Sequence, residues 1–447
     1  MKQNNSYLYK ATVAAALGGL LFGYDTAVIA GAIGFLKIKY QLNPAMEGWV
    51  ASCALVGCII GAMFSGTLSD RIGRKKVLML CALLFAISSI GTGMSELTGF
   101  IFFRIIAGVA IGTASMVSPM YISEIAPAEK RGSLVSINQL GVVTGILVIY
   151  FVNAYIAGLY DEAWNVSTGW RWMFASGAIP SIIFLFTLLS VPESPRWLAK
   201  QGQWDNAENI LSRINGNEKA SSAIAEIKDA LKEEPESFGE IFKPGLRLAL
   251  AIGILLCVFS QVTGINAIMY YAPEIFKATG DASNSALLQT VLVGAVNLLF
   301  TLVAIKYVDS AGRKKLLLIG IAGMAVCLAA VGAAFYFHAE KGFLVLIAIL
   351  AYIAFFEISL GPLTFVVIAE IFPNRIRGRA MSITIFALWS AVFLVSQTFP
   401  ILKDSIGVGN TFLIYMMMAF AAFVFVWKMI PETKGKTLEE IEKTWHR

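Results

Sequence analysis

Twelve long apolar runs occupy most of the sequence and constrain the fold more than any other feature. They start near residues 11, 48, 77, 99, 134, 171, 247, 286, 315, 343, 379 and 411. A bilayer core of roughly 30 Å needs about 20 apolar residues in one helix. Only 14% of all residues are charged, whereas a soluble domain has about 25%. We therefore predict an all-α membrane protein with 12 transmembrane helices.

The polar breaks between the runs indicate the orientation in the membrane. Basic residues gather in the breaks after the second, fourth, eighth and tenth runs, which read RIGRKK (71–76), EKR (129–131), GRKK (312–315) and NRIRGR (374–379). The alternate breaks carry only scattered lysines. By the positive-inside rule, the basic breaks and both termini are predicted to be cytoplasmic. Topology accounts for the net charge of +6, so we expect no nucleic-acid partner.

Residue types that commonly carry catalysis or bind metals form no recognisable set in this sequence. The five cysteines all lie in apolar runs without a CxxC pair, and the two histidines, His338 and His446, stand far apart. No nucleophile–base set, metal-ligand cluster or phosphate-binding glycine loop emerges. The sequence therefore predicts no metal, no cofactor and no enzymatic activity.

The sequence contains two copies of one pattern. SDRIGRKK (69–76) matches VDSAGRKK (308–315), SEIAPAEKRG (123–132) matches AEIFPNRIRG (369–378), and PESPR (192–196) matches PETKG (431–435). The three pairs keep one order and a spacing of about 240 residues, which indicates an internal repeat. All copies lie on the predicted cytoplasmic side, so the two halves are parallel and related by an axis along the membrane normal.

One long polar stretch, Pro192 to Arg247, separates the two copies. Its segments WDNAENILSRI and SSAIAEIKDALKEE have the apolar spacing of short amphipathic helices. We predict a six-helix half over residues 1–195, a cytoplasmic linker with short helices over 196–246, a second six-helix half over 247–432 and a cytoplasmic tail over 433–447.

A series of motifs runs along the chain. It includes GGLLFGYDTAVIAGA (18–32), GTLSDRIGRKK (66–76), PMYISEIAPAEKRG (119–132), PESPRWL (192–198), QVTGINAIMYYAP (261–273), GPLTFVVIAEIFPNRIRG (361–378) and PETKGKTLEEIE (431–442). Together they resemble the sugar porter family of the major facilitator superfamily, over essentially the whole length. The resemblance is to bacterial proton-coupled symporters for xylose, arabinose and glucose and to animal glucose facilitators. It implies the major facilitator fold and transport of a monosaccharide by alternating access.

The first apolar run, Ala11–Leu36, is too long for a signal peptide, and we expect it to be retained. It holds one carboxylate, Asp25, and the fourth run holds Arg104. A charge within the membrane costs roughly 2.5–3.5 kcal/mol on insertion scales, and it indicates a functional site. The two residues could instead form a purely structural pair. The resemblance implies that Asp25 carries the coupling proton and that Arg104 is its partner.

Polar and aromatic side chains within the apolar runs are candidate sugar ligands. Amides can donate to and accept from sugar hydroxyls, whereas aromatic rings can stack on the apolar face of a pyranose. Interhelical bonding and lipid contact are the alternative roles. The resemblance places on the sugar Phe22, Gln139, Ser260, Gln261, Asn266, Tyr270, Asn297, Gly361, Phe365 and Trp389.

Two further groups of residues are expected to control access to the sugar. The resemblance implies an outer gate at Tyr270 and Tyr271. It also implies a cytoplasmic latch of ion pairs among Arg74, Glu124, Arg131, Arg313, Glu370 and Arg377. A charged run beside a membrane is usually only a topology signal. The carboxylates and arginines nevertheless recur in both halves, which topology does not require.

Several positions depart from the bacterial xylose symporter type. They are Ser260 before Gln261, Phe365 in place of a tryptophan, Leu388 in place of a polar residue, Ile146 in place of a glutamine, and Glu357, which resembles the animal facilitators. We therefore expect a hexose or pentose, such as glucose or xylose, with a polyol as an alternative.

The whole set of features predicts a proton–sugar symporter in the plasma (bacterial inner) membrane. Its expected partners are a monosaccharide, a proton and the lipid bilayer, and it is expected to act as a monomer. Two alternatives are an uncoupled sugar uniporter of the same fold and a membrane sugar sensor.

Overall fold

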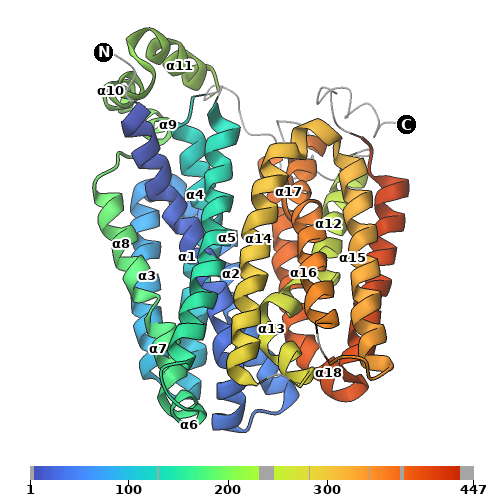
Figure 1. Ribbon diagram of the computed structural model, residues 1–447. Coiled ribbons are helices and arrows are strands. Elements are labelled where there is room, and N and C mark those ends of the chain that lie inside the picture. The colour runs from blue at the N-terminus through green and yellow to red at the C-terminus, as the bar shows by residue number, and fades with distance from the viewer. Residues whose placement is uncertain are drawn as a thin grey trace. The chain divides into compact units, whose positions relative to one another are not determined.

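All regular elements of the described residues are helices (Figure 1). The computed structural model describes residues 5–127, 130–230, 246–280, 282–341, 343–372 and 377–432. The first five crossings are α1 (Asn5–Tyr40), α2 (Pro44–Ile72), α3 (Arg74–Met94), α4 (Leu97–Ile125) and α5 (Arg131–Ala157). The sixth contains α6 (Glu162–Trp164), a π-helical turn (Asn165–Gly169), α7 (Trp170–Ala175) and α8 (Ala178–Leu189).

The second half has the same kind of architecture. Its elements are α12 (Leu246–Val262), α13 (Ile265–Ala278), α14 (Ser283–Ala311), α15 (Arg313–Tyr336), α16 (Leu344–Glu357), α17 (Leu360–Ile371) and α18 (Arg377–Met429). Eleven helical stretches of the described residues are long and apolar enough to cross a membrane. The last spans 53 residues, or about 80 Å, roughly twice a bilayer's thickness.

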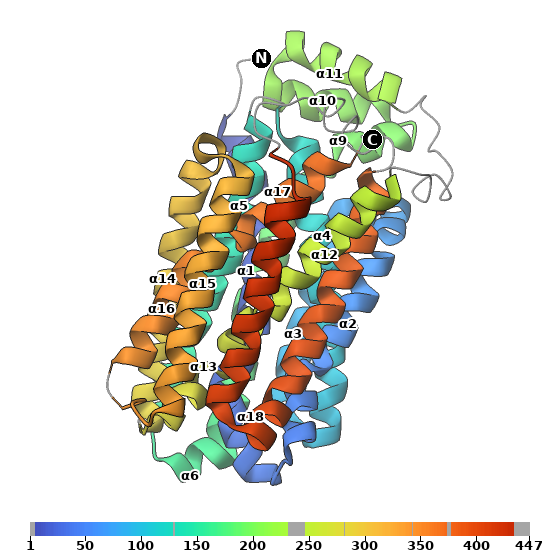
Figure 2. The same cartoon turned by 90° about the vertical axis from the view of Figure 1, so that its right-hand side faces the viewer.

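The long helix α18 resolves the difference between eleven observed stretches and twelve predicted crossings. Gly407 lies within it and has non-helical dihedrals, φ 85° and ψ 160°, which glycine adopts at low cost. The chain therefore turns back at this residue and crosses twice. Figure 2 shows the two arms of α18 beside α12 and α15.

Two crossings of the second half are broken in the middle, as their glycines and prolines predict. Gly264, with φ 97°, separates α12 from α13. The tenth crossing breaks between α16 and α17, and Gly361 and Pro362 lie in the first turn of α17. Proline fits there because the first turn of a helix does not need its N–H. Such breaks leave backbone groups available in the middle of a crossing.

The polar linker forms the two short helices that its sequence predicts, α10 (Trp204–Asn215) and α11 (Asn217–Ala230). A further short helix that was not predicted, α9 (Pro195–Lys200), precedes them. Leu198, Ala199 and Ala207 form their buried core, against which Trp197 and Trp204 pack. In Figure 1 these helices lie at the end of the bundle where α4 ends.

The chain falls into two compact units. The first comprises Met1–Thr26, Val56–Ile146 and Arg171–Pro235, and the second comprises Ala27–Leu55, Leu147–Trp170 and Glu236–Arg447. The second unit thus includes the ends of α1, α2 and α5 that are predicted to be extracellular. These ends pack with helices of the second sequence half.

Candidate functional site

Asp25 and Arg104 form a buried ion pair in the first unit. Arg104, on α4, donates from Nη1 to Oδ2 of Asp25, on α1, at 2.7 Å. It also donates from Nη2 to the backbone carbonyl of Asp25 at 3.2 Å. The side chains of Arg104 and Asp25 are only 2% and 10% exposed. The structure therefore brings together the two residues predicted to handle the coupling proton.

Three predicted sugar ligands are linked at the break between α12 and α13. Gln261 donates from Nε2 to Oγ of Ser260 at 3.0 Å, and Asn266 donates from Nδ2 to Oε1 of Gln261 at 2.5 Å. The left-handed conformation of Gly264 brings the end of α12 next to the first turn of α13. Each amide retains capacity for further hydrogen bonds, as a ligand rich in hydroxyls requires.

A second polar network joins α14 to the end of α16. Asn297 donates from Nδ2 to Oε1 of Glu357 at 3.0 Å, and Thr301 donates from Oγ1 to Oε2 at 3.0 Å. All three residues are buried, and Oδ1 of Asn297 has no hydrogen-bond partner. A buried acceptor without a partner is costly, which points to a donor supplied by a ligand. Gly361 lies close by, since a Cβ there would be 3.1 Å from Glu357.

The remaining predicted sugar residues differ in exposure and belong to different units. Phe22 is half-buried and Gln139 is exposed, and both belong to the first unit. Tyr270 and Trp389, in the second unit, are buried at 4% and 5% exposure. Phe365, also in the second unit, is 44% exposed. The structure thus groups Ser260, Gln261 and Asn266, and separately Asn297 with Gly361.

The predicted outer-gate tyrosines lie in α13 where the helix is distorted. Tyr271 has non-helical dihedrals, φ −118° and ψ 15°, two residues before Pro273. Its hydroxyl donates to the carbonyl of Ser396 on α18 at 3.0 Å, and its ring lies 4.9 Å from that of Phe399. Tyr271 therefore ties α13 to α18, whereas Tyr270 is buried on the same helix.

Gln397 and Glu47, also in the second unit, make contacts that were not predicted from the sequence. Gln397, on α18, accepts from Oγ of Ser52 at 2.9 Å and donates to the carbonyl of Ala45 at 2.9 Å. Glu47, with 1% of its side chain exposed, pairs with Lys37 at 2.8 Å and with Lys403 at 3.8 Å. The signal available in the sequence was a carboxylate directly before an apolar run.

The ion pairs of the first unit that are predicted to be cytoplasmic centre on Arg74. This arginine donates from Nε and Nη2 to the two carboxylate oxygens of Glu124, both at 2.9 Å, and from Nη1 to Asp70 at 2.8 Å. Arg131 is exposed and the structure gives it no ion pair with Glu124. Bidentate pairing fits the fork of a guanidinium. Glu124 thus pairs with Arg74 and not with Arg131, which follows Glu124 in the sequence.

The same arrangement recurs in the second unit. Arg313 pairs with Glu370 at 3.0 Å, and the side chain of Arg377 lies outside the described residues. Glu432 accepts from the backbone N–H groups of Arg313 and Lys314, at 2.9 Å and 3.2 Å.

Glu193 is the counterpart of Glu432 in the first unit. Its Oε1 accepts from the backbone N–H groups of Arg74 and Lys75, at 2.9 Å and 3.0 Å. Each glutamate therefore caps the helix that follows a basic break, α3 or α15. Neither was predicted to have this role, although the paired PESPR and PETKG motifs were the signal.

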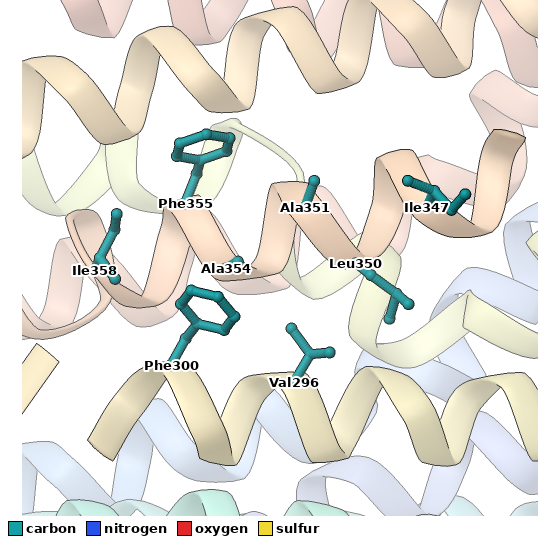
Figure 3. A pocket seen from close by; sticks show the side chains of 8 residues that line it. All are labelled: Val296, Phe300, Ile347, Leu350, Ala351, Ala354, Phe355 and Ile358. Carbon is teal, nitrogen blue, oxygen red and sulfur yellow. The ribbon is translucent and has the colours of Figure 1, made fainter. Parts of the chain in front are cut away.

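An apolar hollow lies between α14 and α16, with a volume of about 420 Å³ (Figure 3). Its lining comprises Val296, Phe300, Ile347, Leu350, Ala351, Ala354, Phe355 and Ile358. No predicted sugar ligand lines it. A sugar needs polar partners for its hydroxyls, so this hollow is unsuited to the substrate.

A family model described as "Sugar (and other) transporter" matches residues 11–445. The arabinose-proton symporter of Bacillus subtilis is 49% identical to the chain, over 97% of this chain and 94% of that protein. The D-xylose-proton symporter of Escherichia coli is 44% identical, over 99% of this chain and 96% of that protein.

Solved structures of the E. coli xylose transporter XylE are similar over nearly their whole length. Its inward open conformation superposes with a TM-score of 0.88 at 42% identity, covering 98% of this chain and 100% of that one. XylE bound to 6-bromo-6-deoxy-D-glucose gives a TM-score of 0.81 at 43% identity, covering 99% of this chain and 100% of that one. These matches confirm the predicted all-α major facilitator fold.

Proposed function

The chain belongs to the sugar transporter family of the major facilitator superfamily, and on that premise we propose that it couples proton entry to uptake of a monosaccharide. The buried ion pair between Asp25 and Arg104 carries the proposal. An uncoupled carrier has no need of an ionisable pair inside the membrane, where each charge is expensive.

Asp25 is proposed to take up the proton and Arg104 to respond to it. With Asp25 ionised, Arg104 holds the carboxylate and its backbone carbonyl at the distances observed. Protonation removes the negative charge, and with it most of the attraction between α1 and α4 at this point. The pair therefore offers two states that depend on the proton, and alternating access requires such a two-state element.

The sugar is proposed to bind at the polar clusters of the second unit, and Phe22 and Gln139 of the first unit remain predicted sugar ligands. The amides of Gln261 and Asn266 supply donors and acceptors, and the unpartnered Oδ1 of Asn297 supplies an acceptor. Among the substrates, we favour a hexose or pentose. The named relatives carry arabinose and xylose, which are sugars of this size.

We also propose the bacterial inner membrane as the location, with both termini in the cytoplasm and the monomer as the working unit. The distribution of lysine and arginine supports this orientation. The bacterial relatives support the choice of membrane.

Counterflow in proteoliposomes tests the function directly. Purified protein is reconstituted, and entry of a panel of labelled pentoses, hexoses and polyols is measured with and without a proton gradient. The proposal expects counterflow of at least one monosaccharide and its accumulation when the outside is acidic. Counterflow without accumulation would identify a uniporter, and binding without either would identify a sensor.

A further inference from the structure

The junction between α7 and α8 contacts Arg104 of the proposed proton pair and Tyr24, the residue that precedes Asp25. α7 ends at Ala175, α8 begins at Ala178, and Ser176 and Gly177 form the short break between them. A Cβ on Gly177 would lie 2.7 Å from Oγ of Ser89, so α3 closely approaches this break. The junction is thus a fixed part of the first unit.

Phe174, in the last turn of α7, faces the guanidinium of Arg104. The distance from Cζ of Arg104 to the ring centroid of Phe174 is 5.3 Å. Phe174 is 3% exposed and Arg104 is 2% exposed, so water screens this contact very little. An arginine within about 6 Å of an aromatic face is attracted by the ring quadrupole, most strongly when both groups are desolvated.

A second aromatic ring holds Phe174 in this position. Phe100 lies one helical turn before Arg104 on α4, and its ring meets that of Phe174 edge-on, at 5.0 Å and 90°. This is a preferred geometry for an aromatic pair. Phe100 is fully buried, so the ring of Phe174 has little freedom to turn away from the guanidinium.

The same junction also contacts α1 next to Asp25. The hydroxyl of Tyr24 lies 2.8 Å from Oγ of Ser176, and Ser176 donates to the carbonyl of Met173 at 2.6 Å. Tyr24 immediately precedes Asp25. The end of α7 therefore contacts the arginine through Phe174 and the side chain of Tyr24, the neighbour of Asp25, through Ser176.

We propose that Phe174 is a positioning residue of the proton site, which holds Arg104 against Asp25 and so sets the pH at which the carrier releases its proton. The inference rests on the proposed role of Asp25. Among the described residues, Arg104 on α4, Tyr24 on α1 and Cys58 on α2 interact with Asp25. Arg104 is the cation of these three, and its Nη1 contacts the carboxylate directly at 2.7 Å.

Replacement of Phe174 by trifluorinated phenylalanine tests the proposal without changing the packing. Fluorine withdraws charge from the ring face, while the side chain keeps nearly its shape. We expect the pH of half-maximal proton-driven uptake to rise by about half a unit or more, because Arg104 then stabilises the ionised Asp25 less well. Phe174→Leu should shift the pH profile in the same direction. Phe174→Tyr, which keeps an aromatic ring beside Arg104, should retain the wild-type pH profile.

Phe184→Leu is the matched control. Phe184 is a fully buried phenylalanine on α8, and no cation is recorded beside it in the described part of the chain. Its pH profile should coincide with that of the wild type. A profile for the fluorinated variant that coincides with the wild type would overturn the proposal, as would equal shifts in Phe174→Leu and Phe184→Leu.

Asp25→Asn, measured beside these variants, separates the inference from the proposed function. If Asp25→Asn loses proton-driven accumulation while the fluorinated variant keeps the wild-type pH profile, only the proposed role of Phe174 is refuted. Normal accumulation in Asp25→Asn removes the proposed proton site itself, and the inference with it.

Discussion

At the scale of single residues, a buried polar atom without a partner is costly, and at a predicted sugar ligand it indicates where the sugar can bind. Asn297 is the clearest case. Its Nδ2 is fixed by Glu357, whereas its Oδ1 is buried and has no partner. Glu357 and Thr301 thereby determine which face of the amide remains available to a sugar hydroxyl. The sequence singled out Asn297 and Glu357 separately, but it did not show that they form one network.

Removal of the Thr301 hydroxyl should weaken sugar binding. In Thr301→Val, Oε2 of Glu357 loses its donor, and a buried acceptor without a partner costs about 1–3 kcal/mol. Glu357 can then turn away from Asn297, so we expect the KM for the sugar in counterflow to rise about fivefold or more.

Thr290→Val is the control for that change. Thr290 lies on the same helix, is equally buried and donates only to the carbonyl of Ala286. Its KM should stay near that of the wild type. Equal KM values in the two variants would show that the carboxylate does not orient Asn297.

At the scale of helices, close approaches at glycines decide which elements can separate. Gly48 lies where α2 meets α18 at the predicted outer end, and a Cβ there would lie 2.2 Å from the carbonyl oxygen of Gln397. Because real Cβ atoms do not come so close to backbone, Gly48→Ala must push α2 from α18 and break the hydrogen bonds of Gln397.

Gly48→Ala should therefore favour opening at the outer side. A cysteine placed at Ser52, which is fully buried, reports the opening through an impermeant maleimide added from outside. We expect labelling to increase severalfold. Gly66→Ala on the same helix is the control, because a Cβ there meets nothing within 4 Å. Labelling that is equally slow in both variants would contradict the described contact.

The helix caps at the end predicted to be cytoplasmic allow another prediction. Glu193 accepts from two backbone N–H groups at the start of α3 and from the N–H of Ser194. Glu193→Ala removes this acceptor and should lower stability by about 1 kcal/mol, as loss of a helix cap does, and thermal unfolding in detergent measures it. Glu208→Ala, at an exposed position on α10, should leave the melting temperature unchanged. A melting temperature of Glu193→Ala equal to that of the control would refute the capping role.

At the scale of the whole molecule, the pattern of hydropathy and the glycines that interrupt apolar runs made the fold predictable. The observed helices begin within a few residues of most predicted starts, and Gly264 and Gly361 lie at breaks. Which side chains pair across the fold was harder to predict from the sequence. The family resemblance placed Arg74, Arg131 and Glu124 in one group without stating which arginine pairs with the carboxylate, and the packing of α3 against α4 brings Arg74 to Glu124.

In the candidate site too, contacts between side chains on different helices were only partly predictable from the sequence. The charges of Asp25 and Arg104 within apolar runs, together with the family resemblance, predicted that the two residues pair, because charges in lipid are costly without a partner. The support from Phe174 depends on where α7 ends, and an aromatic residue in a chain with 12% aromatics gives no such signal.

The most direct test of the central claim is sugar accumulation by Asp25→Asn in proteoliposomes under an inward proton gradient. The account predicts that this variant still exchanges labelled sugar in counterflow, while the gradient no longer drives its accumulation above the outside concentration. Asp205→Asn, at an exposed position on the linker helix α10, should accumulate sugar like the wild type. Full gradient-driven accumulation by Asp25→Asn would contradict the account.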